Sequence, residues 1–361
     1  MFFRPKRKDR YDERLYIIHC LANKLLIFDK NHKMILTNKN VLITGGAGFI
    51  GSNLCDKLLA QNNQVVCLDN LLTGKKENIA HLLDNSNFTF IEGDIRNLDD
   101  CKKAVSGADL VLHQAALGSV PRSIEDPATT NEINISGFLN MLLAAKEEGI
   151  KRFVYAASSS TYGDSKELPK IEENIGMPLS PYAVTKYVNE LYAHVFGSLY
   201  GMELIGLRYF NVFGRRQDSN GAYAAAIPKF ILAFMSHKSP IIHGDGTQTR
   251  DFTYIDNVIQ ANELAATTTN KDACNQVYNV AFGDETVLID LINKLRELLS
   301  AHDPKIKEVE PEHGPERLGD VRYSLASIDK AKRNLGYNPT HSINKGLEEA
   351  IDWYWENLKK Q

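Results

Sequence analysis

Short apolar runs alternate with stretches of helical periodicity over most of the chain. The runs span residues 39–44, 64–68, 88–92, 109–113, 153–157 and 203–207, and each ends at small or polar residues. Between them, apolar positions recur with the spacing of a helix face. Such alternation predicts a parallel sheet wound in both directions and covered by helices on both faces. The fold class predicted is therefore α/β, with a doubly wound parallel sheet.

A glycine-rich turn lies between the first run and the first helical stretch. Gly45, Gly48 and Gly51 have the spacing G-x-x-G-x-x-G. In dinucleotide-binding units these glycines permit a tight turn, the approach of a pyrophosphate and close packing of helix on strand. The phosphates then lie on the positive end of the helix. Turn glycines are common, but the strand before and the helix after favour a Rossmann-like nucleotide-binding domain.

The ends of the next runs supply the remaining cofactor residues. Asp69 ends the second run, where a carboxylate accepts from the ribose hydroxyls of NAD and repels the extra phosphate of NADP. A simple turn role is the alternative for Asp69. Asp94 and Ile95 are expected to flank the adenine, and Gln114, Ala115 and Ala116 to leave room for a flat ring. Neighbouring turn residues complete the predicted set, namely Phe49, Ile50, Asn70, Thr73 and Gly74. NAD is the predicted cofactor.

Tyr182 and Lys186 are four residues apart, and Ser158 opens a serine triplet at the end of the fifth run. Positions i and i+4 share a helix face, so we expect the ammonium of Lys186 to lower the pKa of the Tyr182 phenol from about 10. The serine hydroxyl suits an oxygen that gains or loses a proton. The three residues are the predicted catalytic group for taking a proton from a sugar hydroxyl while a hydride leaves the same carbon. A surface tyrosine beside a solvated lysine is the simpler alternative.

Length and composition narrow the class of protein further. A chain of 361 residues can bury a large core in one or two domains. A formal net charge of −3 and 43% hydrophobic residues are ordinary for a soluble enzyme and do not indicate a nucleic-acid partner. The five cysteines are scattered without a C-x-x-C pair, which predicts reduced thiols, a cytoplasmic location and no metal site.

The domain organisation has three predicted parts. Residues 1–35 are an extension of unknown role, too short and too polar in its apolar stretch to span a membrane. A leader peptide, an amphipathic helix and a translation start at Met34 stay open as interpretations. Residues 36–210 form the nucleotide-binding domain, to which segments near 250–272 return. Residues 211–361 form a smaller α/β domain, with strands expected at 240–243, 277–280 and 305–309 and helices from 256, 287, 324 and 344.

Four motifs resemble the extended short-chain dehydrogenase/reductases of the UDP-sugar 4-epimerase type. They are HQAALGSVPRS at residues 113–123, AASSSTYGD at 156–164, LSPYAVTKYVNE at 179–190 and RYFNVFGRRQ at 208–217. The resemblance covers about residues 38–357 and is strongest to bacterial enzymes that interconvert UDP-N-acetylglucosamine and UDP-N-acetylgalactosamine for surface polysaccharides. Some close relatives of these enzymes act on uronic acids.

The resemblance implies NAD-dependent 4-epimerisation of a UDP-sugar through a 4-keto intermediate. Tyr182 is then the base, Lys186 holds the nicotinamide ribose and Ser158 bonds the sugar O4. The implied cofactor contacts add Asn134 and Phe210. The implied substrate contacts are Ser119, Ser159 and Ser160 for the hexose, and Asn211, Ala225, Ile241, His243, Arg250, Arg317 and Asp320 for UDP. Ile241 and His243 replace the tyrosine and asparagine of close relatives, which weakens the expected aromatic contact to uridine.

The alternatives to this function differ in chemistry. A sugar-nucleotide 4,6-dehydratase carries an Asp-Glu pair after the active-site Thr, and residues 158–162 hold no carboxylate. A decarboxylase is disfavoured for similar reasons, and a non-catalytic NAD-binding protein usually lacks the Tyr or the Lys. UDP-glucose and the UDP-N-acetylated uronic acid remain alternative substrates. The resemblance places a gatekeeper at Ser324, where a small residue admits an N-acetyl group; a helix cap is the alternative role.

The predicted partner is a second copy of the chain. Long helices are expected at 127–148 and 181–200, and in the family such a pair forms the four-helix bundle of a homodimer. Phe138, Leu142, Tyr187 and Leu191 are candidate contact residues, although a place in the core fits them as well.

Overall fold

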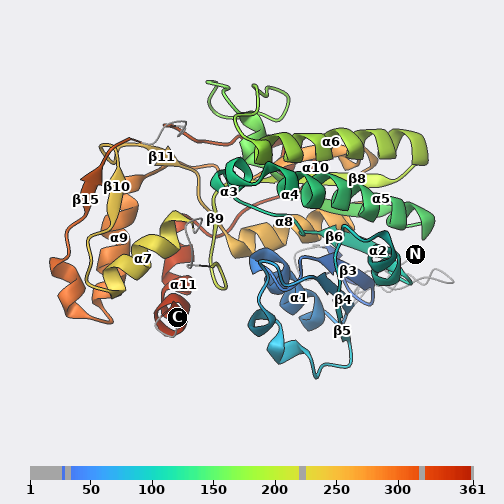
Figure 1. Ribbon diagram of the computed structural model, residues 1–361, viewed down its shortest axis with the longest axis horizontal. Coiled ribbons are helices and arrows are strands. Elements are labelled where there is room, and N and C mark those ends of the chain that lie inside the picture. The colour runs from blue at the N-terminus through green and yellow to red at the C-terminus, as the bar shows by residue number, and fades with distance from the viewer. Residues whose placement is uncertain (1–26, 29–33, 219–224, 317–321, 359–361) are drawn as a thin grey trace, which may run out of the picture.

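A seven-stranded parallel sheet is the centre of the molecule (Figure 1). The computed structural model describes residues 27–28, 34–218, 225–316 and 322–358. In spatial order the strands are β13 (Gln276–Val280), β8 (Glu203–Tyr209), β7 (Arg152–Ser158), β6 (Leu110–His113), β3 (Asn40–Thr44), β4 (Gln64–Asp69) and β5 (Phe88–Glu92). Every neighbouring pair is parallel. The predicted α/β fold class is confirmed.

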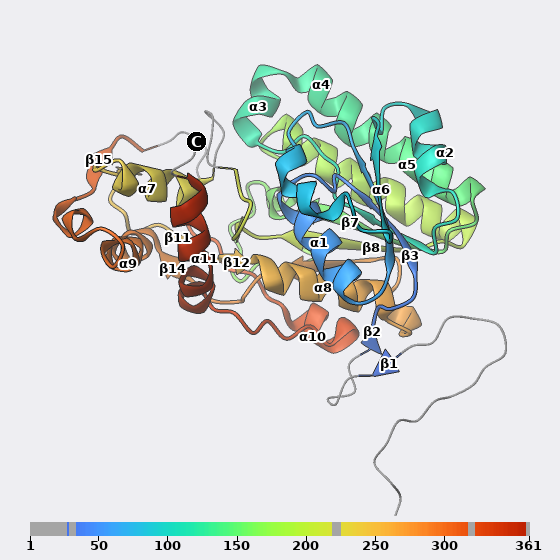
Figure 2. The same ribbon diagram turned by 90° about the horizontal axis from the view of Figure 1, so that it is seen from below.

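Helices cover both faces of this sheet, as its apolar runs require. α1 (Phe49–Ala60) and α8 (Ile255–Thr267) pack on one face, and α2 (Leu98–Val105), α5 (Phe138–Glu147) and α6 (Pro181–Tyr200) on the other (Figure 2). Side chains alternate between the faces along a strand, so Leu42 and Ile43 of β3 enter two different hydrophobic clusters. The sheet edge where the strands end is thereby left for a ligand.

The helix α6 has the limits expected from its sequence. Ser180 is the N-cap and its hydroxyl accepts from the Ala183 amide at 3.2 Å, while Pro181 occupies the first turn. Gly201 ends the helix with φ 65°. These ends place Tyr182 in the first turn, beside the carboxyl ends of the strands.

The helix expected at 127–148 is present, but a π-helical turn that the sequence did not predict interrupts its regular geometry. The structure has α4 (Pro127–Asn131), a π-helical turn at Glu132–Gly137 and then α5. Within that turn Asn134 is buried and exchanges hydrogen bonds with the backbone of Leu117. Such turns are frequent near functional sites, and this one joins the helix to the loop after β6.

Short strand pairs and three helices build the second part of the molecule. The helices are α7 (Ala226–Met235), α9 (Leu288–Ser300) and α11 (Ile343–Leu358). The strand pairs are β9 (Val212–Phe213) with β12 (Thr253–Tyr254), β10 (Ile241–His243) with β15 (Glu312–Gly314), and β11 (Thr249–Arg250) with β14 (Thr286–Val287). The remaining short elements are α3 (Val120–Glu125), α10 (Asp329–Leu335) and 3₁₀ turns at Lys76–Asn78, Ala80–Leu82, Ser159–Tyr162, Lys271–Ala273 and Pro304–Glu308.

Three predictions for this part are corrected. Residues 277–280 belong to β13, which pairs with β8 in the central sheet. The strand expected at 305–309 is a 3₁₀ turn, because Asp303 caps it through the Lys305 amide and Pro304 sets its first turn. The helix expected from 324 begins at Asp329, so Ser324 lies before it and does not cap it.

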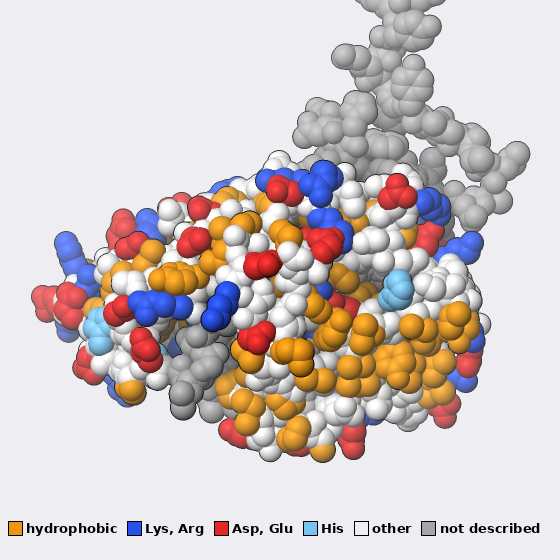
Figure 3. Space-filling view, turned by 90° about the horizontal axis from the view of Figure 1, so that it is seen from above, with side chains coloured by type: hydrophobic (Ala, Val, Ile, Leu, Met, Phe, Trp, Pro, Cys, Tyr) orange, Lys and Arg blue, Asp and Glu red, His pale blue; other side chains and the backbone are white. Residues whose placement is uncertain are grey.

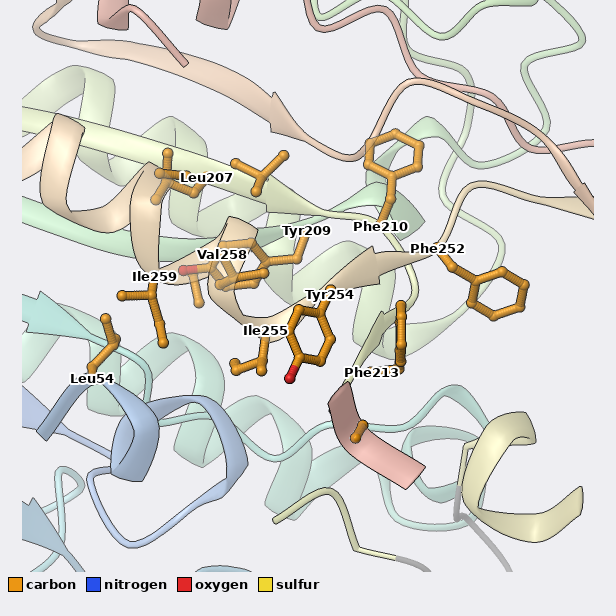
Figure 4. Packing of buried hydrophobic residues seen from close by; sticks show 14 of the residues in the cluster. Leu54, Leu207, Tyr209, Phe210, Phe213, Phe252, Tyr254, Ile255, Val258 and Ile259 are labelled. Atoms are coloured by element: carbon orange, nitrogen blue, oxygen red, sulfur yellow. The ribbon is translucent and has the colours of Figure 1, made fainter. Parts of the chain in front are cut away.

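One hydrophobic cluster joins the sheet to the second part. Figure 4 shows residues of this cluster from both parts, among them Leu207 and Tyr209 of β8, Phe213 of β9, Tyr254 of β12 and Ile255 of α8. The exposed fractions of these residues are all below a tenth. The two parts therefore share one core, and α8, within the range predicted to return to the first domain, packs on that sheet.

The described residues before the sheet form a short hairpin. β1 (Ile27–Phe28) pairs in antiparallel orientation with β2 (Met34–Ile35), and β2 contacts α8. The rest of the extension lies outside the described residues. Within the described ranges, no helix has both the length and the apolar character that crossing a bilayer requires.

Candidate active site

A cavity of about 420 Å³ opens at the carboxyl ends of β3, β4, β6, β7 and β8. Most of the predicted cofactor residues line it together with the predicted catalytic group. These are Gly45, Gly48, Phe49, Ile50, Gly51, Asp69, Asn70, Thr73, Gly74, Ile95, Gln114, Ala115, Ala116, Ser158, Tyr182, Lys186 and Asn211. The fold thus brings residues from several distant segments to one place.

The glycine turn is shaped by close backbone approach. Gly45 has φ +68°, and a Cβ there would lie 2.7 Å from the Ala115 backbone nitrogen. A Cβ on Gly51 would lie 2.1 Å from the Gly45 carbonyl oxygen. Neither position admits a side chain without movement of the main chain. The backbone therefore forms the wall of the cavity at the start of α1, as an extended pyrophosphate requires.

Asp69 fixes the loop that borders the other side of this cavity. Its carboxylate accepts from the amides of Ala47 at 2.9 Å and Leu71 at 2.8 Å. Burial, which outweighs these two hydrogen bonds, raises the pKa of Asp69. Each carboxylate oxygen keeps a further lone pair, so a ribose hydroxyl can still be bound. The turn role and the ribose role are compatible in this geometry.

Three predicted cofactor residues do not line the cavity. Asp94 pairs with the Arg96 guanidinium at 2.7 Å, which lowers the Asp94 pKa to about 2, and it accepts from Asn70. Asn134 is buried against Leu117, as described above. Phe210 is fully buried and its ring packs at 5.9 Å from that of Tyr162. Asp94 and Asn134 therefore contact residues that line the cavity, namely Asn70 and Leu117.

The predicted catalytic group converges on the cavity. The Tyr182 phenol and the Ser158 hydroxyl border the same cavity, and the hydroxyl acts to lower the pKa of the phenol. Lys186 lies one turn further along α6, its Nζ 6.0 Å from the centre of the Tyr182 ring. The same Nζ donates to the Ala156 carbonyl oxygen at 2.9 Å. Strand β7 and helix α6 therefore place a hydroxyl, a phenol and a buried amine side by side.

The electrostatics of this group differ from the expectation. Burial raises the pKa of Tyr182, and the Ser158 hydroxyl only partly opposes that shift. The predicted lowering by Lys186 is therefore wrong for the protein alone. Burial also lowers the pKa of Lys186 to about 8, against the effect of the nearby Glu190 carboxylate. Both shifts have one cause, because a low-dielectric site disfavours phenolate and ammonium alike.

The other predicted hexose contacts surround this group without lining the cavity. The Ser160 hydroxyl donates to the Ser158 hydroxyl at 2.9 Å, and Ser159 opens the same 3₁₀ turn. Ser119 caps α3 with φ 102°, a conformation that is rare for a residue with a side chain. In this structure Ser160 therefore orients the Ser158 hydroxyl.

A second cavity of about 530 Å³ lies in the second part of the molecule. Three predicted UDP residues, Ile241, His243 and Arg250, line it with Lys229 and Lys238. The His243 ring Nδ1 lies 3.0 Å from the Pro315 carbonyl oxygen. The predicted UDP set is therefore divided, because Asn211 lines the first cavity instead.

Two further predicted substrate residues, Ala225 and Ser324, line neither cavity. Ala225 is exposed before α7, next to Ala226 of the second cavity. Ser324 is half-buried between β11 and α10 in the sequence and lines neither cavity. Arg317 and Asp320 lie outside the described residues.

Comparison with known proteins places this fold in a family. Residues 41–281 match the model of the NAD dependent epimerase/dehydratase family. This chain belongs to that family. A putative UDP-glucose 4-epimerase of Methanocaldococcus jannaschii is 37% identical, over 88% of this chain and 99% of that protein.

Two solved structures show the same fold. The UDP-N-acetylglucosamine 4-epimerase of Methanobrevibacter ruminantium M1, in complex with UDP-N-acetylmuramic acid, is 38% identical with a TM-score of 0.82, over 89% of this chain and 99% of that chain. The UDP-glucuronic acid 4-epimerase of Bacillus cereus, in complex with UDP-glucuronic acid and NAD, is 34% identical with a TM-score of 0.79, over 88% and 99%. The predicted cofactor of this epimerase-family chain, NAD, is confirmed.

The resemblance also implied that Leu117 and Gly118 line the NAD, and both border this cavity. Several cavity residues of this family member escaped the sequence analysis, namely Leu68, Leu72, Gly93, Ile133, Ala156, Ala157, Tyr209 and Val212. Tyr209 is the most polar of them, and its hydroxyl donates to Gln114 at 3.1 Å and accepts from Asn262 at 2.9 Å. Tyr209 ends β8, so the rule that ligands bind at strand ends would have found it. Asn262 lies on α8, and no local signal marks it.

Proposed function

We propose that this protein catalyses the NAD-dependent 4-epimerisation of UDP-N-acetylhexosamines. The observation that supports this most is that Tyr182, with Ser158 and with Lys186 one helical turn away, lines the same cavity as the glycine turn. A proton acceptor and a site for a dinucleotide then border one space. The solved UDP-N-acetylglucosamine 4-epimerase of similar fold supports the choice of substrate.

In the proposed reaction Tyr182 removes the proton from O4 of the hexose and later returns it to the same oxygen, after the 4-ketose has turned so that the hydride comes back to the opposite face of C4. NAD, when bound, accepts the hydride from C4, and its positively charged ring favours the phenolate. Ser158 donates to the phenolate or to the sugar oxygen, because Ser160 donates to the Ser158 hydroxyl and orients it. Lys186 supplies a positive charge below a pH of about 8.

The substrate nucleotide is proposed to extend from this cavity to the second one. Asn211 borders the first and Arg250 the second, and Arg250 belongs to β11. A guanidinium suits a pyrophosphate, and Lys229 and Lys238 add positive charge near it. Anchoring UDP there leaves the 4-ketose free to turn before hydride and proton return.

Incubation of purified protein with UDP-N-acetylglucosamine and no added NAD tests the reaction. We expect the C4 epimer to form, since the cofactor is regenerated in each turnover and need not be supplied. A 4-keto-6-deoxy product would instead indicate a dehydratase, a pentose a decarboxylase, and no conversion of any UDP-sugar a non-catalytic protein. UDP-glucose and the UDP-N-acetylglucosamine-derived uronic acid, assayed in parallel, decide among the substrates.

Ser324→Tyr tests the proposed choice of an N-acetylated sugar. If Ser324 borders the C2 substituent, a bulky ring there reduces turnover of UDP-N-acetylglucosamine sharply while UDP-glucose is spared. Ser324→Ala is the matched control, since it stays small. Equal activity of the tyrosine variant on both sugars contradicts the role of Ser324 and leaves the epimerase reaction standing.

We further propose a homodimer built on α6. The outer face of this helix exposes Val184, Leu191, Val195 and Leu199, each with 45–69% of its surface accessible. Figure 3 shows hydrophobic side chains gathered on this side of the molecule. Leu191→Glu is expected to give monomers in light scattering, whereas Leu83→Glu, at an exposed site outside α6, is expected to leave the mass unchanged.

A further inference from the structure

A buried carboxylate joins four separate segments of the chain at the border between the two parts. Asp251 lies between β11 and β12 and has no exposed surface. Its carboxylate accepts from the backbone amides of Phe282 at 3.1 Å, of Gly283 at 3.2 Å and of Ala326 at 3.2 Å. Its own carbonyl oxygen accepts from the side chain of Asn211 at 3.0 Å.

These contacts connect the edge of the central sheet with residues that border the two cavities. Phe282 and Gly283 follow β13, the edge strand of the central sheet. Ala326 lies in the segment 322–327, which contains Ser324. Asn211 borders the first cavity, and Arg250, the residue before Asp251, borders the second. Asp251 therefore lies where the sheet and the proposed nucleotide contacts meet.

The segment 322–327 is held by backbone hydrogen bonds and by contacts at the surface. The Thr249 amide donates to the Arg322 carbonyl at 3.0 Å, and Lys170 exchanges backbone hydrogen bonds with Leu325 at 2.8 Å and Ser327 at 2.9 Å. The exposed Arg322 guanidinium pairs with the Asp245 carboxylate at 2.7 Å. Asp251 differs from Asp245 because it is fully buried and accepts from a backbone amide of the segment. A hydrogen bond to a charged acceptor is stronger than one to a neutral acceptor, so the Asp251 carboxylate holds the Ala326 amide more firmly.

Packing alone does not account for an aspartate here. A fully buried carboxylate loses its hydration, and burial raises the pKa of Asp251 to about 7 in spite of the three amide donors. The charges that act on it do not compensate, because the Asp284 carboxylate raises the pKa further. Tyr337, buried after α10, is the other titratable group coupled to it, and the neighbouring Arg250 donates instead to the carbonyls of Thr249 and Arg322.

We propose that Asp251 is a positioning residue that holds residues 322–327, with Ser324, in register with Asn211 and Arg250. This proposal rests on the function proposed above. Asp251 touches no reacting atom; it acts through the three segments that it joins. Its loss is expected to weaken binding of the sugar nucleotide and to change the preference among sugars, while binding of NAD stays the same.

Asp251→Asn is the first test, because the amide has nearly the shape of the carboxylate. Its NH₂ group meets backbone N–H donors, so at least one of the three amides loses its acceptor. We expect KM for UDP-N-acetylglucosamine to rise about tenfold, the ratio of activities on UDP-N-acetylglucosamine and UDP-glucose to change, and kcat and copurified NAD to stay within about twofold. Asp284→Asn, the same change at an exposed position in the adjoining turn, is the matched control and is expected to change none of these.

The pH dependence of binding is a readout that a merely structural role does not move. UDP-sugars do not titrate near neutrality, so a rise in their KM as the pH falls through about 7 reports protonation of Asp251. We expect this rise in the natural protein, the same rise at lower pH in Asp284→Asn because the carboxylate that raises the pKa of Asp251 is gone, and a flat profile in Asp251→Asn. If Asp251→Asn does not fold, Asp251→Glu takes its place: the displaced carboxylate is expected to raise KM and to change the ratio of activities on the two sugars, and an unchanged KM and ratio overturn the proposal.

Calorimetry separates this proposal from the proposed reaction. Dissociation constants for UDP-N-acetylglucosamine are measured in a Tyr182→Phe background, with and without Asp251→Asn. Unchanged affinity and unchanged sugar preference in a folded Asp251→Asn protein overturn the positioning role while catalysis stands. Weaker binding in that variant supports the role even if the natural protein turns over none of the UDP-sugars, an outcome that overturns only the reaction.

Discussion

The cofactor side of the crevice and the side proposed to bind UDP are built by different means. On the cofactor side, backbone turns form the wall of the cavity, and the glycines that permit these turns lie close together in the sequence. On the other side, Asn211 and Arg250 border different cavities, and their relation depends on contacts such as that of Asp251 with residues 282, 283 and 326. The first side is fixed locally, and the second is fixed by long-range hydrogen bonds.

The largest expected effect lies where the two sides meet. Tyr182→Phe removes the proposed proton acceptor, so we expect kcat to fall by about 10²- to 10⁴-fold while bound NAD is retained. Tyr209→Phe removes the same atom from a second tyrosine of the cavity, one that bonds Gln114 and Asn262. We expect kcat of this variant to fall by about tenfold at most, because the side-chain amides of Gln114 and Asn262 lose their hydrogen-bond partner. Equal losses in steady-state assays of the two variants contradict a special role for Tyr182.

Two ion pairs on the central sheet provide the next comparison. Arg208 of β8 pairs with Glu190 of α6 at 2.7 Å, with only 4% and 7% of the two side chains exposed. Arg152 of β7 pairs with Glu203 of β8 at the same distance, but at 13% and 20% exposure. The first pair lies toward the catalytic end of the strands and the second at their opposite ends.

Glu190→Gln is expected to lower the free energy of unfolding by about 3–5 kcal/mol, because Arg208 is left buried without its counter-ion. Glu203→Gln leaves a better solvated guanidinium, so we expect the free energy of unfolding to fall by only about 1 kcal/mol. Urea unfolding measures the free energy of both variants. Glu190 also favours the charged form of Lys186, so Glu190→Gln should move the loss of activity on the alkaline side to lower pH, whereas Glu203→Gln should not. The same alkaline limit in both variants contradicts the link to Lys186.

The sequence was sufficient for the features that depend on adjacent residues. The six apolar runs, the glycine turn and the limits of α6 follow from local spacing and capping, and the structure has them at the expected places. A strand was expected at 277–280, but its place as β13 in the central sheet was not, because nothing in these residues tells whether they pair with β8 or within the second part. The π turn at Glu132–Gly137 escaped because helical periodicity continues through it.

The site shows the same division. The placement of Ser158, Tyr182 and Lys186 followed from strand ends and helix spacing. The raised pKa of Tyr182 did not, because burial on all sides is a property of the folded chain. Asn134 and Phe210 were assigned to the cofactor by resemblance alone, and the structure places their side chains one layer behind the cavity.

A smaller effect is expected from Gly51→Ala, which tests the local character of the cofactor side. The added Cβ would lie 2.1 Å from the Gly45 carbonyl oxygen, so the turn must open at a cost of about 1–3 kcal/mol. We expect copurified NAD to fall about tenfold, as measured by absorbance after denaturation. Gly149→Ala also places a methyl group at positive φ, but it meets no atom within 4 Å. It should lose stability without losing NAD; an equal loss of NAD in both variants would show that general destabilisation is responsible.

The smallest expected effect concerns a direct link between the two sides. Lys75, next to Gly74 of the cofactor loop, pairs with Asp218 at 2.8 Å, and their side chains are 36% and 48% exposed. An ion pair in that environment contributes about 0–1 kcal/mol and is screened by salt. Lys75→Gln should therefore change urea unfolding little, less still at high salt, and leave the dissociation rate of NAD within about twofold. Lys102→Gln, which breaks the exposed Lys102–Glu147 pair inside the cofactor side, is the control. If Lys75→Gln released NAD much faster than Lys102→Gln, surface charge would couple the two sides, and buried contacts such as those of Asp251 would not be the only connection that matters.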